Sequence, residues 1–142
     1  MARVTFVVMG AWGPGIYEND DAADWSAEVA EFGLSAVEGA LDAAIDSEYI
    51  EAPEGACALA AADVVARLVS GRGESSAYCE DVVAWVEANA SAPPASLVAK
   101  AQTAVERVKG ADSELAELWS EDAESLTQWA ASVADVESRL NP

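Results

Sequence analysis

Acidic side chains are crowded near the start of the chain, in the segment GAWGPGIYENDDAADW, residues 10–25. Four carboxylates fall within one expected helical turn and its entry: Glu18, Asp20, Asp21 and Asp24. Carboxylate oxygens at this density are typical ligands of a hard cation such as Ca²⁺ or Mg²⁺. A glycine-rich loop before a helix can instead present backbone N–H groups to an anion, but the nearby carboxylates disfavour an anion.

A second pair of acids, Glu51 and Glu54, brackets Pro53 at the start of an alanine-rich segment. The simpler interpretation is that both carboxylates complement the positive end of a helix dipole. If folding brought them close to Asp20 or Asp24, the pair could act as acid and base in a hydrolase. A carboxylate-dependent or divalent-metal-dependent enzyme is therefore the alternative function, although no catalytic residue, metal ligand or cofactor is assigned.

The composition excludes several other chemistries. Histidine is absent, which removes His-ligated metal sites and the Ser-His-Asp and Cys-His nucleophiles. The serines stand in neither a G-x-S-x-G nor an S-x-x-K motif, so nucleophilic catalysis has no recognisable starting point. These exclusions favour a protein that is not an enzyme.

The charge balance is extreme, with 26 acidic residues against 7 basic ones and a net charge of −19. Such a field repels phosphate backbones and anionic lipid surfaces, so we expect neither nucleic-acid nor membrane binding. Its simplest purpose is solubility, and its more specific one is attraction to a basic partner. We therefore expect an acidic, non-enzymatic binding or regulatory protein, similar to an immunity protein or inhibitor, with a basic protein as partner. The oligomeric state is not predicted.

The elements that must position these residues are helices. Alanine is the commonest apolar residue and has the highest helix propensity, which predicts an all-α fold. We expect a compact bundle of about six helices around a central helix, residues 53–69, preceded by a Gly/Trp-rich loop. This helix is apolar almost all round, as buried helices are, and Asp63 and Arg67 are spaced to pair along it.

Local signals predict where individual helices begin and what they bury. Asn19 or Asp20 is expected to cap the first helix, whose apolar stripe extends to Phe32 before Gly33 ends it. Ser35 and Glu38 form the pattern of a capping box for the second helix. A short fourth helix is expected to bury four apolar side chains: Val82, Val83, Trp85 and Val86.

The C-terminal segment, residues 113–140, has an apolar stripe with helical spacing in which Asp122 is the one polar member. We expect a single long helix kinked near Ser120, in preference to a separate last helix capped by Ser120. A buried Asp122 would then face Arg67 or a tryptophan N–H.

The opening segment has a structural interpretation, which we favour, beside the functional ones. Its glycines and proline would bend the chain so that Trp12 and Tyr17 are buried against the bundle, while Asn19 and Asp20 bind open helix donors. In the functional interpretation the segment contributes to a binding surface. The candidate binding residues are Trp12, Tyr17, Glu18, Asn19, Asp20, Asp24, Glu51 and Glu54.

The opening also resembles a bacterial family, domain-of-unknown-function family 4259, whose members begin M-G-(A/T)-W-G-x-G-x-(F/Y)-x-N-D-x-A-x-D-W. The matching residues are Met9, Gly10, Ala11, Trp12, Gly13, Gly15, Tyr17, Asn19, Asp20, Ala22, Asp24 and Trp25. The segment YIEAPEGACALAAADVVA and the later LWSED are similar too, so the resemblance covers nearly the whole chain from Met9. It implies no activity. Because members start at the methionine that matches Met9, we expect residues 1–8 to be a poorly ordered extension and residues 9–142 a single all-α domain.

The sequence predicts a soluble, cytoplasmic protein. The opening MARVTFVV is too short for a signal peptide, and the apolar run 56–69 is interrupted by charges and too short to cross a bilayer. Cys57 and Cys79 are expected as buried, reduced thiols, in preference to a disulfide.

Overall fold

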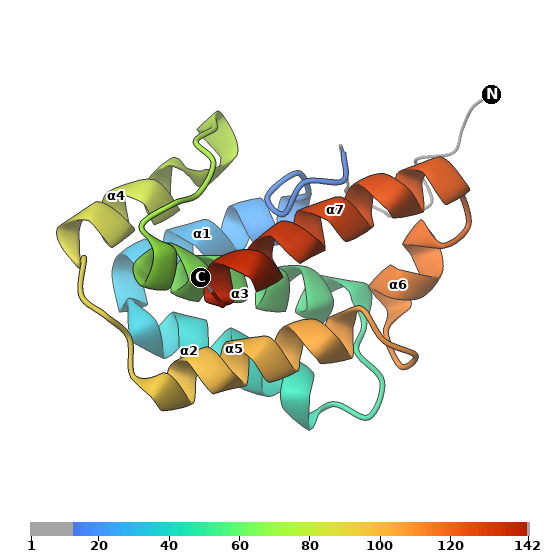
Figure 1. Cartoon of the computed structure of the whole chain (residues 1–142), viewed down its shortest axis with the longest axis horizontal. Coiled ribbons are helices and arrows are strands. Elements are labelled where there is room, and N and C mark those ends of the chain that lie inside the picture. Colours follow the sequence, from blue (N-terminus) through green and yellow to red (C-terminus); the bar gives the residue numbers. More distant parts are fainter. Residues whose placement is uncertain (1–12, 142) are drawn as a thin grey trace.

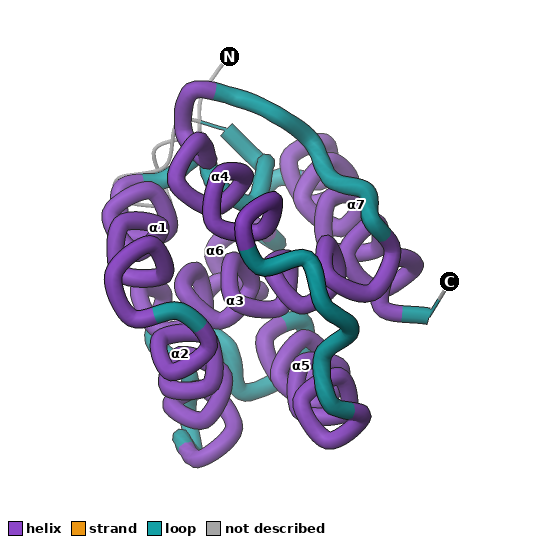
Figure 2. The backbone as a smooth tube through the Cα atoms, turned by 90° about the vertical axis from the view of Figure 1, so that its left-hand side faces the viewer, coloured by secondary structure: helices purple, strands orange, loops and turns teal. Residues whose placement is uncertain are grey.

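Helix α3 (Ala52–Ser70) is the axis of the fold in the computed structural model, which describes residues 13–141. It is buried from Gly55 to Arg67 with the one exception of Cys57, and Figure 2 shows it enclosed by its neighbours. Its alanines let other helices approach closely, because they add little side-chain volume. The prediction of an all-α bundle around a central helix is confirmed.

Six further α-helices surround α3 in the described part of the chain (Figure 1). Helices α1, α2, α5 and α7 pack along it, α6 lies near its N-terminal end, and α4 lies at the edge of the bundle, mainly against α1. A short 3₁₀ helix, η2 (Ala77–Cys79), precedes α4. The bounds are α1 (Asp20–Phe32), α2 (Leu34–Asp46), α4 (Glu80–Ala88), α5 (Ala95–Val108), α6 (Glu114–Trp119) and α7 (Ala123–Leu140).

The junction between α1 and α2 is a single residue, Gly33. Its φ of 62° is easily reached only by glycine, and its N–H donates to the carbonyl of Val29 to close α1. Because α2 begins at Leu34, Ser35 already lies inside the helix and has no capping geometry. The predicted capping box is therefore wrong, and Glu38 instead pairs with Lys100 of α5 at 2.9 Å.

The C-terminal segment folds as two helices, so the single kinked helix is wrong. Ser113 accepts a hydrogen bond from the N–H of Ala116 at the start of α6. Asp122 accepts one from the N–H of Ser125 at the start of α7. Asp122 rather than Ser120 is thus the cap of the last helix. Of the two predicted partners of Asp122, the contact with Arg67 is wrong, because Arg67 pairs with Asp63 instead.

Hydrogen bonds connect the loop before α3 to the loop before α6. Ile50 donates its N–H to the carbonyl of Asp112 and accepts from the N–H of Glu114, each at 2.9 Å. The Glu114 carboxylate then accepts the N–H of Ala52 at 2.7 Å, which satisfies one of the open donors at the start of α3. These bonds connect segments more than sixty residues apart.

Two predictions of burial fail at the edge of the bundle. Phe32, expected in the apolar stripe of α1, is 58 % exposed. Of the four apolar side chains expected in the core from α4, Val82 is buried, whereas Val83, Trp85 and Val86 are half-buried against the core. Periodicity alone therefore overstated how fully the apolar side chains of α1 and α4 are buried.

The predictions for residues 1–8 and for Trp12 lie outside the described residues. Between residues 13 and 141, no helix has both the length and the apolar character needed to cross a membrane.

Candidate binding surface

The opening loop is fixed to the central helix through Tyr17. This side chain is 2 % exposed, and its hydroxyl donates to Asp63 Oδ2 at 2.7 Å. Burial, followed by the charge of Asp63, raises the pKa of Tyr17 well above 10. The neighbouring Ile16 is also buried. The loop therefore covers α3, as the structural interpretation requires of Tyr17.

Glu18 closes the turn of this loop. Its Oε1 accepts the N–H of Gly15 at 2.8 Å, and a Cβ at Gly13 or Gly15 would come within 2.7 Å of that oxygen. Asn19 accepts the N–H of Ala22 and caps α1. Both side chains thus have partners within the loop and the first turn of its helix.

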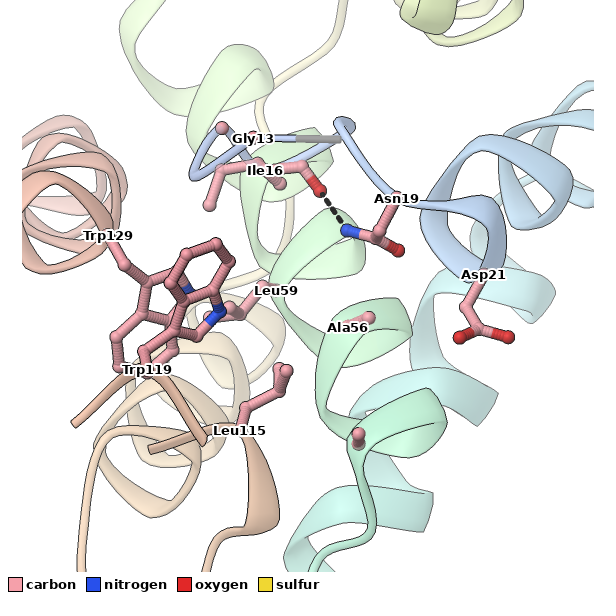
Figure 3. A pocket seen from close by; sticks show the side chains of 11 residues that line it. Gly13, Ile16, Asn19, Asp21, Ala56, Leu59, Leu115, Trp119 and Trp129 are labelled. Carbon is pink, nitrogen blue, oxygen red and sulfur yellow. Dashed lines mark hydrogen bonds between the residues drawn. The ribbon is translucent and has the colours of Figure 1, made fainter. Parts of the chain in front are cut away.

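A small cavity lies beneath the loop, where Trp119 and Trp129 stack with ring centroids 6.5 Å apart (Figure 3). Its volume is about 20 Å³, which is room for little more than one water molecule. Asn19 and Asp21 are its polar lining residues. A cavity of this size cannot hold a substrate or an organic ligand.

The other predicted acids do not join Glu18. Asp20 and Asp24 are exposed on α1 and Glu51 is exposed at the N-cap of α3, whereas Glu54 accepts from Ser47 Oγ at 3.3 Å. Among residues 13–141, no group of three or more cysteine, aspartate and glutamate side chains is placed to hold a metal ion.

A buried charge network lies at the centre of the molecule. The predicted pair of Asp63 with Arg67 is confirmed at 2.6 Å, and Arg139 of α7 adds a contact to the second carboxylate oxygen at 2.5 Å. Burial lowers the pKa of both guanidinium groups, but the surrounding groups, Asp63 foremost, together raise it above its ordinary value. Sequence reasoning missed Arg139. The available signal was its position among apolar residues at the end of the last helix, where a basic side chain needs an acidic partner.

The charges outside this network are distributed unevenly along the chain. Residues 13–66 contain thirteen Asp and Glu but no Lys or Arg. Lys100 of α5 contacts two acids of α2, Glu38 and Asp42, each at 2.9 Å. Lys109 pairs with Glu137 of α7 at 2.7 Å, and Arg107 donates to backbone carbonyls at the end of α2. The exposed acids of α1 therefore have no basic neighbour on their own helix.

An open apolar groove of about 490 Å³ lies within this acidic region, between α1, α2 and the start of α3. We call it the α1–α2 groove. Phe32 and Cys57 contribute apolar surface, and Glu28 and Glu54 supply its acidic groups. The groove exists because α2 presents only small side chains there. The full lining is Trp25, Glu28, Phe32, Ser35, Ala36, Gly39, Ala40, Ala43, Pro53, Glu54 and Cys57.

Cys57 is the thiol in the groove lining, and its surroundings make it less reactive than an ordinary cysteine. Burial, and then the charges of Asp21, Glu28 and Asp24, raise its pKa to about 12. The thiol is therefore protonated at neutral pH and is a poor nucleophile. Cys57 and Cys79 are both unpaired, but Cys57 is only partly buried, in contrast to the prediction.

Glu54, one of the predicted binding residues, lines the groove, but sequence reasoning missed the groove itself. Two signals pointed to it: small residues repeated along one side of α2 and an aromatic residue directly before the helix-ending Gly33. These signals indicate a groove only if α3 leaves this part of α1 and α2 uncovered, which the sequence does not reveal.

Comparison with curated proteins and with solved structures finds no match. The model of a protein family described as "Domain of unknown function (DUF4259)" matches residues 10–132. The match covers most of the chain and includes the opening loop, the acidic region and the Asp63–Arg67 pair, whereas Arg139 lies beyond it. The chain belongs to the DUF4259 family.

Proposed function

We propose that this chain is an acidic binding protein that recognises a basic protein through the face formed by α1 and α2. The observation that carries the proposal is the charge distribution: residues 13–66 hold half of all the acids and no cation. Two of the remaining cations, Arg67 and Arg139, are buried against Asp63.

This distribution favours recognition over solubility alone. Solubility requires net charge but no particular placement of it, whereas concentrated charge of one sign costs stability through self-repulsion. A cationic partner would relieve that repulsion and would be steered toward the face during diffusion. Binding of this kind would block the partner's basic surface, in the manner of an immunity protein or inhibitor.

The two unpaired cysteines support a reducing location such as the cytoplasm. A partner in the same compartment is therefore part of the proposal. The acids outside the groove serve the binding through their field, because exposed charges act over about one Debye length, ~8 Å in physiological salt.

The test compares two variants with the same net charge. Asp24→Asn with Glu28→Gln neutralises two acids on the proposed face, and Glu121→Gln with Glu124→Gln neutralises two exposed acids near the start of α7. Each is titrated with a lysine- and arginine-rich peptide at low and moderate salt. We expect the first variant to bind several-fold more weakly than the wild type, the second to lose less than twofold, and salt to weaken every complex.

Equal losses in the two variants would mean that only net charge matters, and would overturn the proposed face. Absence of measurable binding at low salt would overturn the proposed function as a whole.

A further inference from the structure

The α1–α2 groove constrains the backbone of any segment that binds in it. Its walls are the helices α1, α2 and α3, whose backbone N–H and C=O groups are engaged within the helices except at the helix ends. A bound extended strand would find few backbone partners along these walls, and its own polar groups would be desolvated at a cost. A helix satisfies its own backbone, so the groove suits a helical segment.

The small side chains of α2 allow such a helix to lie close to the wall. Gly39 leaves the groove open at its middle, since a Cβ built there would meet no heavy atom within 4 Å. Ala36, Ala40 and Ala43 continue the same surface. Phe32, 58 % exposed, lies in the groove lining as an apolar contact for the occupant.

The charges of the groove decide between possible occupants. Glu28 and Glu54 line it, and the charges of Asp21 and Asp24 act on Cys57 within it. A second copy of this chain would bring one acidic face against another, which opposes self-association. Lysine and arginine beside an apolar stripe would match both the acids and the groove lining.

We propose that the α1–α2 groove binds an amphipathic helix of the partner, with its apolar side on α2 and its basic residues beside the acids of α1 and α3. The inference rests on the proposed function and adds the mode of docking. Anchors spaced i, i+3, i+4 and i+7 would fit such a groove.

The test uses two synthetic peptides of identical composition made from Leu, Lys and Arg. One places leucines at helical spacing, and the other scrambles them so that no apolar stripe forms. We expect the wild type to bind the amphipathic peptide at least tenfold more tightly, with a gain of helical circular dichroism in the complex. We expect both complexes to weaken with salt.

Gly39→Leu is the variant that blocks the groove. The added side chain meets open space and replaces a helix-interior glycine, so the protein is expected to fold with unchanged or higher stability. The tenfold preference for the amphipathic peptide should disappear, while binding of the scrambled peptide stays. Ala130→Leu, on an exposed position of α7, is the matched control and should keep the preference.

Cys57 provides a second readout, since it lines the groove whereas Cys79 is fully buried. The amphipathic peptide should slow alkylation of Cys57 by N-ethylmaleimide at least fivefold, and the scrambled peptide should not. Equal binding of both peptides, unaffected by Gly39→Leu, would overturn the docking mode and leave the proposed function standing. A peptide complex that strengthens with salt would show that apolar contact alone drives the binding, and would overturn the inference that acids select a basic helix.

Discussion

Asp63 in the core and the acids of the α1–α2 face are the same kind of side chain under opposite conditions. Asp63 is 2 % exposed and accepts hydrogen bonds from Arg67, Arg139 and Tyr17. The acids of α1 are exposed for the most part, and no basic residue lies on their helix. In a chain with seven basic residues, two of them therefore serve a single internal carboxylate.

The two groups of acids affect different properties: the buried Asp63 affects stability, and the exposed acids determine the surface potential. A buried charge without partners is costly, and removing one member of a buried pair costs about 3–5 kcal/mol. An exposed ion pair contributes only about 0–1 kcal/mol. Separating Arg67 or Arg139 from Asp63 is therefore costly, while the exposed acids of α1, which have no basic residue on their helix, keep their field for a partner.

The largest expected effect comes from Asp63. Asp63→Asn leaves the buried Arg67 without its counterion and Arg139 with only the exposed Asp135, and we expect the free energy of unfolding to fall by about 3–5 kcal/mol. Urea denaturation monitored by tryptophan fluorescence measures the change. Asp135→Asn is the control, because this acid also binds Arg139 but its side chain is 61 % exposed; it should cost under about 1 kcal/mol. Similar losses in the two variants would contradict the proposed contrast between core and surface.

Removal of the Tyr17 hydroxyl should have the next largest effect. Tyr17→Phe keeps the buried ring and deletes the hydrogen bond to Asp63, and bonds to charged groups contribute about 1.5–3 kcal/mol. The same urea experiment measures the loss. A loss of less than about 0.5 kcal/mol in Tyr17→Phe, the size expected of an ordinary surface substitution, would contradict the role given to this hydrogen bond.

The same hydroxyl should make the stability of the protein depend on pH in the alkaline range. The pKa of Tyr17 is raised in the folded protein, so its contribution to stability is fully present below the unfolded pKa of about 10 and is lost as pH rises toward the folded value. We expect the free energy of unfolding to decline above pH ~10.

Tyr17→Phe should show a shallower decline in denaturation curves collected from pH 8 to 11. Cys57→Ser should remove a further part of it, because the pKa of Cys57 is also raised, to about 12. An identical pH slope in the wild type and in Tyr17→Phe would refute the assignment to Tyr17.

The smallest effect is expected on the acidic face. Asp24→Asn with Glu28→Gln should stabilise the free protein by a few tenths of a kcal/mol, because it relieves like-charge repulsion. Added NaCl should raise the melting temperature of the wild type by screening the same repulsion. The variant should gain less from salt than the wild type does in differential scanning calorimetry. A melting temperature that falls with salt would show that repulsion does not limit stability.

Much of the fold could be predicted because helix signals are local. Asn19 as a cap, Gly33 as a helix end and the pairing of Asp63 with Arg67 all depend on residues within four positions of one another. The errors arose where a neighbour far along the chain decides. Phe32 has the spacing of a core residue, yet the bundle does not extend far enough to cover it.

The helical class, the buried axis and the concentration of acids before residue 67 follow from the sequence alone, since propensity, periodicity and charge are properties of short segments. The contact of Arg139 with Asp63, across 76 positions, arises from the packing of the folded chain. The tertiary structure also formed the groove, from α1, α2 and the start of α3. Both depend on how helices pack, and packing fills a shared volume that no single segment specifies.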